Sequence, residues 1–236
     1  MDDVAEQREI VRRNDAMLAE RPGDDAAHEA RARAHLALGH LEEAEADAMD
    51  AVRLDPEEVR YRELLAEIQS RRGEHADAAA EYAHLARRDP RQVAWTVGEA
   101  AERIEAADAE KGVDAARRAV RLDPRSFDAQ LALARGLIRT GEAGALAAAT
   151  RALDLRPGDA AAREATADAL WLADRHAAAF DALRGLAAEL SDPDRARVLA
   201  KARSLYRERA GWLGRRLASV RALFEFALGH GWLRVR

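Results

Sequence analysis

The chain has 236 residues, with 38 Lys and Arg against 43 Asp and Glu, a formal net charge of −5, and no cysteine. Disulfides, thiolate metal sites and cysteine nucleophiles are therefore excluded, and no uninterrupted apolar run approaches the roughly 18 residues needed to span a bilayer. Alanine supplies 58 residues by count while only 5% are aromatic, so the composition favours an all-α protein. We expect a soluble, cytoplasmic protein, because the N-terminus lacks the basic and then apolar run of a secretory signal.

Evenly spaced prolines divide the chain into repeating units. Most of them follow a similar phrase, as in Leu54-Asp55-Pro56 and Leu122-Asp123-Pro124. Because proline disfavours helical geometry in the residue before it, each phrase predicts the end of a helix and the close of one unit. Five of the six prolines recur at intervals of 34, 34, 34 and 33 residues: Pro22, Pro56, Pro90, Pro124 and Pro157.

Small residues and glycines define what lies inside each unit. Glycines about seventeen residues before a proline predict a tight turn between two helices, since glycine adopts the left-handed conformation that ends a helix; these are Gly39, Gly73 and Gly141. Small or apolar residues recur seven apart on one face of the second helix, where they let a neighbouring helix approach closely. They are Ala44 with Ala51, Ala78 with Leu85, Gly112 with Ala119, and Ala145 with Ala152. The unit is predicted to be a helical hairpin.

In chain order, we predict a lone helix over residues 5–20, five hairpins, and a separate C-terminal region. The third hairpin departs most from the pattern, since Ala107 replaces the turn glycine and Gly112 stands in an alanine column, and the fourth lacks one residue after Gly141. Asp192 and Pro193 begin a helix to about Glu208, and a last helix is expected from about Trp212 to Leu228. The hairpins span about residues 24–56, 57–90, 91–124, 125–157 and 158–190, and the C-terminal helix pair spans 191–236.

Over about residues 1–190 the sequence resembles the tetratricopeptide-repeat family, whose signature is a 34-residue helix-turn-helix with small residues in fixed columns and a closing proline. The resemblance is weaker in the first helices, where Arg31, Glu99 and Thr166 replace large apolar residues. It implies an all-α solenoid, capped by the C-terminal helix pair, whose first helices line a concave binding face. The residues implied on that face are Glu29, Arg33, Leu36, Arg60, Glu63, Glu67, Arg71, Val97, Ala101, Ile104, Asp128, Leu131, Arg135, Ile138, Arg139, Glu164, Asp168 and Trp171.

The implied face has charged walls and an apolar middle, which suits an extended or helical peptide with apolar anchors and flanking charges of both signs. Two alternatives stay open: the charges are a solvated surface, and Trp171 packs between repeats. The chain has a single asparagine, Asn14, outside this face, which disfavours the asparagine-rich mode by which related domains grip chaperone tails.

The C-terminal region is basic and aromatic. From Lys201 to Arg236 there are nine Lys or Arg and two acidic residues, a net charge of 9 − 2 = +7. An apolar stripe from Trp212 to Leu228 has three interpretations: a solenoid cap, a partner or homodimer face, or a surface that docks on an anionic membrane. The residues assigned to a docking surface are Trp212, Arg215, Arg216, Phe224, Phe226 and Trp232.

Motifs for catalysis are absent from the sequence: we find no glycine-rich phosphate loop, nucleophile-elbow serine or paired metalloprotease histidines. We therefore expect no enzyme activity, cofactor or metal, and no nucleic-acid binding, because the repeat region is acidic. The first hypothesis is a non-catalytic scaffold or adaptor, and the alternative is a membrane-peripheral assembly factor. An excess of 36 Arg over two Lys, with the many alanines, is typical of the coding bias of a high-GC bacterium.

Overall fold

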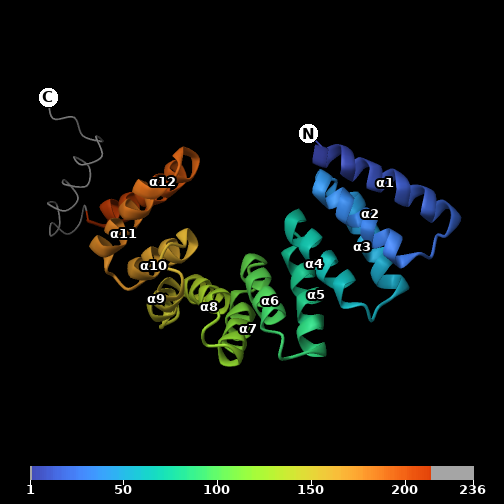
Figure 1. Ribbon diagram of the computed structural model, residues 1–236. Helices are drawn as coiled ribbons and strands as arrows, with labels where there is room; N and C mark the ends of the chain where they lie inside the picture. Colours follow the sequence, from blue (N-terminus) through green and yellow to red (C-terminus); the bar gives the residue numbers. More distant parts are fainter. Residues whose placement is uncertain (1, 214–236) are drawn as a thin grey trace. The chain divides into compact units, whose positions relative to one another are not determined.

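The computed structural model describes the backbone of residues 2–213 and the side chains of residues 4–205. This part of the chain is built from helices alone, as the all-α prediction requires, and within each unit most helices pack against the next helix in sequence (Figure 1). The helices are α1 (Asp2–Glu20), α2 (Asp25–Leu38), α3 (Leu41–Leu54), α4 (Val59–Arg72), α5 (His75–Arg88), α6 (Val93–Glu105), α7 (Ala109–Leu122), α8 (Phe127–Thr140), α9 (Ala145–Leu155), α10 (Ala160–Leu172), α11 (His176–Glu189) and α12 (Asp192–Leu213).

The turn within each hairpin has the left-handed backbone that the glycines predict. Gly39, Gly73 and Gly141 end α2, α4 and α8 at φ values of 78°, 80° and 71°. The third and fifth hairpins keep this turn without glycine, because Ala107 and Asp174 have φ values of 62° and 58°. A left-handed backbone costs a residue with a Cβ about 1–2 kcal/mol, so these two turns store strain.

The second helices end as the proline phrases predict. Asp55, Asp89 and Asp123 cap α3, α5 and α7 with extended backbones just before the prolines. Each of these carboxylates accepts a hydrogen bond from the amide two residues further on, at 2.9–3.0 Å. The aspartate therefore fixes the loop in which the proline stops the helix.

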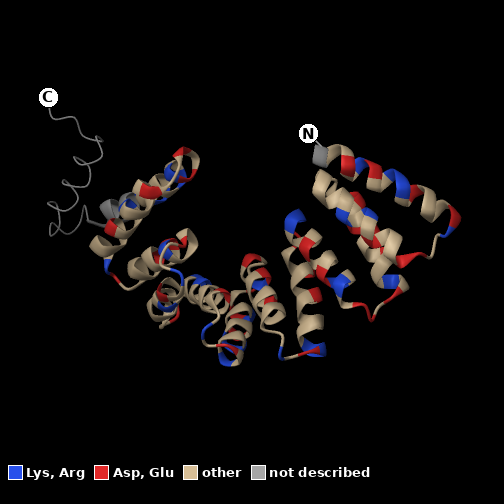
Figure 2. Cartoon of the chain, viewed as in Figure 1, with Lys and Arg blue, Asp and Glu red and all other residues tan. Residues whose placement is uncertain are grey.

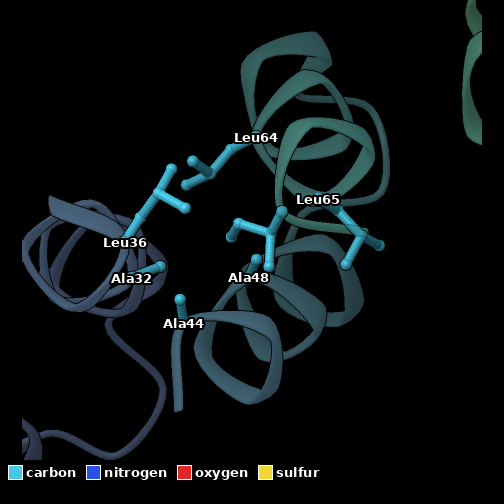
Figure 3. Close-up of a cluster of buried hydrophobic side chains, with 7 residues drawn as sticks. Ala32, Leu36, Ala44, Ala48, Leu64 and Leu65 are labelled. Carbon is cyan, nitrogen blue, oxygen red and sulfur yellow. The ribbon is translucent and has the colours of Figure 1, made fainter. Parts of the chain in front are cut away.

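The small columns of the second helices are buried. Ala44 and Ala51 have no exposed surface, and their counterparts in the later hairpins are also buried. Figure 3 shows how Ala32, Ala44 and Ala48 bring α2, α3 and α4 together, with Leu36, Leu64 and Leu65 filling the space between them. Alanine thus allows close helix contact, and leucine supplies most of the apolar area.

One residue that departs from the family pattern, Arg31, forms an ion pair with a buried carboxylate. Arg31 donates to Asp47 on α3 at 2.6 and 2.8 Å and to Asp15 on α1 at 2.6 Å. Asp47 is 4% exposed. Removing one partner of such a pair would leave a buried charge uncompensated, which typically costs about 3–5 kcal/mol.

The described residues fall into two compact units, one ending at Ala145 and the other beginning at Leu146, and each is treated by itself below. The division comes at the start of α9, beside the turn that lacks one residue. In the second unit α12 continues to Leu213, so the predicted end near Glu208 and new start at Trp212 are wrong. The helix passes through Gly211, because one glycine costs a helix only about 1 kcal/mol.

The C-terminal docking residues Arg215, Arg216, Phe224, Phe226 and Trp232 lie outside the described residues, and Trp212 is described only by its place at the end of α12. Among the helices that are described, none has the length and apolar character needed to cross a bilayer.

Candidate functional site

The first helices of successive hairpins lie side by side in the unit that ends at Ala145. Arg60 on α4 lies 3.6 Å from Glu29 on α2. The indole nitrogen of Trp95 on α6 donates to Glu63 on α4 at 2.6 Å. Arg139 on α8 donates to Glu105 on α6 at 3.2 Å. These contacts join α2, α4, α6 and α8 into one continuous face.

A pocket of about 640 Å³ opens on this face and draws its walls from four hairpins. It contains five of the residues that the sequence assigned to the concave face, Arg33, Glu63, Glu67, Val97 and Asp128. Side chains more than 30 residues apart in sequence are therefore brought together, as the solenoid arrangement requires. The remaining lining residues are Leu64, Tyr82, Val93, Ala94, Trp95, Gly98, Asp123 and Ser126.

Two aromatic rings that the sequence reasoning missed give the pocket its apolar surface. Trp95 stands on α6, and Tyr82 reaches the pocket from the second helix α5. Gly98 makes room for Tyr82, since a Cβ at Gly98 would lie 2.8 Å from the ring. The signal in the sequence was a glycine in the middle of a first helix, which indicates close approach of another group.

The pocket lining is acidic. Glu63, Glu67, Asp123 and Asp128 contribute carboxylates, while the one lining cation, Arg33, donates to Glu29 at 2.9 Å. Burial, and then the carboxylates of Glu102, Glu67 and Glu63, raise the pKa of the Tyr82 hydroxyl, so it stays protonated. Figure 2 shows that both acidic and basic positions occur along the helices of this part of the chain.

Glu63 and Glu67 differ in the groups that donate hydrogen bonds to their carboxylates. Glu67 accepts from Arg71 at 2.8 Å, in a pair of which both side chains are about half exposed and which therefore stabilises the helix only slightly. Glu63 accepts from the Trp95 indole and forms no ion pair with the described side chains of residues 4–205. The Glu63 carboxylate is thus available to a cation that enters the pocket.

Comparison with known proteins identifies the architecture. No family model and no curated protein sequence matches the chain. Among solved structures, a tetratricopeptide repeat protein from Parabacteroides merdae matches with a TM-score of 0.68 at 15% identity, covering 98% of this chain and 91% of that one. MamA matches with a TM-score of 0.61 at 16% identity, covering 71% and 97%. YrrB, described as a TPR protein with an unusual peptide-binding site, matches with a TM-score of 0.59 at 16% identity, covering 80% and 97%.

The chain has the tetratricopeptide-repeat fold. The structure corrects the prediction that Ile104 and Leu131 line the groove. Ile104 and Leu131 are 2% and 8% exposed and do not line a surface. A Cβ added to Gly112 or Gly136 would meet Ile104 at 2.7 and 3.3 Å, so Ile104 fills space that these glycines leave.

Other predicted groove residues of the TPR face lie outside the pocket. Leu36 is buried, at 8% exposure, and belongs to the core of the first two hairpins. Arg135 is exposed and Ile138 is half-buried, both on α8. Arg60, Arg71 and Arg139 each pair with a carboxylate of the same face. These pairs hold the walls of the groove in place.

In the unit that begins at Leu146, the predicted residues contact neighbouring helices. Asp168 and Glu164 on α10 both accept from Lys201 on α12, at 2.6 and 2.8 Å. Burial raises the pKa of Asp168 against the opposing effect of Lys201. Trp171 packs on the rings of His176 and Phe180, with centroids 4.2 and 5.7 Å apart; both rings belong to α11, so these contacts lie within one hairpin and not between repeats.

Proposed function

We propose that this protein is a non-catalytic interaction scaffold, whose TPR groove binds a peptide or helical segment of a partner protein. The observation that carries the proposal is the pocket of about 640 Å³ that gathers Arg33, Glu63, Glu67 and Val97 with two aromatic rings. Solenoids of this kind use such faces for binding, and the similar fold of YrrB, whose description names a peptide-binding site, supports the proposal.

The pocket also suggests the chemistry of the bound segment. An apolar side chain would bury its surface against Tyr82, Trp95 and Val97. Basic side chains beside it would meet Glu63, which has no ion pair within the described part of the chain, and Glu67, whose Arg71 partner is exposed. We therefore propose a segment with an apolar anchor and predominantly basic flanks.

The test is selection of a random peptide library on the full-length protein, followed by affinity measurement for the selected synthetic peptides. Glu63→Lys should weaken their binding at least about tenfold, which corresponds to about 1.4 kcal/mol. Glu42→Lys is the matched control, because Glu42 is an exposed glutamate on α3 with the same charge change and lies outside the pocket lining. Equal binding by the wild type and both variants would contradict the groove proposal.

Membrane docking through the basic aromatic C-terminal region stays a prediction, because its residues lie almost entirely outside the described part of the chain. Flotation with anionic but not neutral vesicles would favour it, and absence of flotation with either would count against it.

A further inference from the structure

Polar residues occupy one equivalent position in the first helices of four hairpins, at intervals of 34 residues. They are His28, Arg62, Thr96 and Gln130. In the first hairpin, His28 contacts Asp47 at 3.1 Å and the Pro22 carbonyl at 3.2 Å. In the fourth, Gln130 donates to the corresponding carbonyl at 3.0 Å, that of Pro124.

The second hairpin follows the same plan: Arg62 donates to Glu81 on α5 at 2.7 Å. Glu81 stands 34 residues after Asp47, so the same column of the second helix supplies the carboxylate in both hairpins. In three of the four hairpins that begin before Ala145, a long polar side chain thus fills the space between the first helix and its neighbours.

The third hairpin lacks both members of this arrangement. Thr96 occupies the column of the first helix, and Ala115 stands where Asp47 and Glu81 supply carboxylates. Thr96 is 3% exposed, and its hydroxyl makes no hydrogen bond with the residues that the structure describes. Among the same residues, no side chain donates to the carbonyl of Pro90, the counterpart of Pro22 and Pro124.

A pocket of about 550 Å³ opens where the long side chain is missing. Thr96 and Pro90 line it, and it shares no lining residue with the groove pocket. The Thr96 hydroxyl is not among the fully buried side-chain atoms that lack a partner, and as a lining residue it can offer a hydrogen bond to a polar ligand in the pocket.

The walls of this pocket are basic. Arg87 on α5 and both Arg118 and Arg121 on α7 line it, against a single carboxylate, Glu99. Arg87 and Arg121 are exposed and form no ion pair with the described residues.

The carboxylate in the wall is already neutralised. Glu99 is 6% exposed and accepts from Arg103 at 3.0 Å and from Arg118 at 2.7 Å. It therefore acts to hold Arg118 in position, and the lining keeps a formal charge of 3 − 1 = +2.

We propose that this pocket, between α5, α6 and α7, binds the phosphoryl group of a phosphate monoester. Guanidinium groups form paired hydrogen bonds to phosphate oxygens. The three guanidiniums and the Thr96 hydroxyl together offer more hydrogen-bond donors than the two oxygens of a carboxylate can accept. A phosphate monoester has three terminal oxygens, which can accept from all of these groups. The site is separate from the groove and does not depend on the function proposed for it.

The test is calorimetric titration of the full-length protein with phenyl phosphate, with benzoate as the carboxylate comparison. Thr96→Gln is the decisive variant, because Gln130 shows that glutamine fits this column and reaches the proline carbonyl. This substitution should fill the part of the pocket beside Pro90, remove the Thr96 hydroxyl and abolish phenyl phosphate binding while leaving the circular dichroism spectrum and melting temperature intact. Arg121→Gln should weaken binding about tenfold or more.

Arg53→Gln is the matched control, since Arg53 stands in the same column as Arg87 and Arg121 but pairs with Asp50 at 2.6 Å and lines no part of this pocket. The Arg53→Gln variant should bind phenyl phosphate with the affinity of the wild type. Binding only to vesicles that contain phosphatidic acid, still lost in Thr96→Gln, would assign the phosphoryl group to a lipid headgroup. Three results would each overturn the proposal: no binding of either phenyl phosphate or phosphatidic acid vesicles, an affinity for benzoate equal to that for phenyl phosphate, or undiminished phenyl phosphate binding by a folded Thr96→Gln variant.

Discussion

Gly112 provides a sharp test of how closely α6 and α7 pack. The residue stands in a column where Ala44, Ala78 and Ala145 are buried without difficulty, so the repeat pattern alone predicts that Gly112→Ala is tolerated. Helix propensity even favours the change by about 1 kcal/mol. The structure predicts the opposite result.

A Cβ at Gly112 would lie 2.7 Å from Cγ1 of Ile104, 3.1 Å from the carbonyl oxygen of Ala100 and 3.2 Å from the amide nitrogen of Ile104. Two of these atoms belong to the backbone of α6 and cannot move without the whole helix. Overpacking of a core costs about 1–3 kcal/mol, and rigid neighbours place this case near the upper end. After subtraction of the propensity gain, Gly112→Ala should destabilise the protein by about 2 kcal/mol.

Urea unfolding measured by circular dichroism gives the change in free energy of unfolding, and hydrogen exchange of amides in α6 and α7 localises it, because each repeat contacts only its neighbours. Gly185→Ala in α11 is the control. A Cβ there meets only the end of the Arg163 side chain at 3.6 Å, so this variant should be stabilised by about 1 kcal/mol. A Gly112→Ala variant as stable as the wild type, with unchanged exchange in α6, would refute the predicted close packing.

Three further predictions concern single interactions. Ala107→Gly should relieve the left-handed strain at φ 62° and stabilise the third turn by up to about 1 kcal/mol in thermal unfolding, whereas a lower melting temperature would contradict the strain argument. Tyr61→Phe should destabilise the protein by about 1.5–3 kcal/mol in urea unfolding, because the hydroxyl donates to Asp25 at 2.7 Å, and an unchanged stability would show that this hydrogen bond contributes nothing. Burial alone would raise the pKa of Glu164, but hydrogen bonds, chiefly from Lys201, outweigh this effect and lower the pKa below 4.5. The ionised carboxylate therefore stabilises the fold above pH 4.5, and this stabilisation is lost as the pH falls through the lowered pKa. Glu164→Gln should reduce the acid dependence of the melting temperature, and an identical pH profile would contradict the assignment.

The sequence by itself determined the repeat and its boundaries. Proline and the aspartate before it stop the second helices of the first three hairpins through local backbone geometry, as at Asp55-Pro56, and glycine permits the left-handed turn at Gly39. Buried alanines such as Ala44 follow from the period alone. These features depend on contacts within a few residues or on spacing, which is why they could be predicted without coordinates.

Only part of the candidate groove could be predicted in this way. The register assigned Glu63, Glu67 and Val97 correctly to the face that carries the pocket, but Tyr82 reaches that pocket from a second helix. Ile104 was placed on the surface by its column, although the missing side chain of Gly112 draws it inward. Which way a side chain at the edge of a face turns depends on the volume of its partners on other helices.

The basic pocket at Thr96 was decided by tertiary structure alone. The spacing already aligns Thr96 with His28, Arg62 and Gln130, but periodicity does not reveal that those side chains reach across to neighbouring helices. A short side chain leaves a cavity only when the surrounding helices hold their positions, and they do so because other contacts fix them. Local backbone preferences therefore determined the hairpins, whereas the packing of side chains from distant segments determined where the surface is hollow and charged.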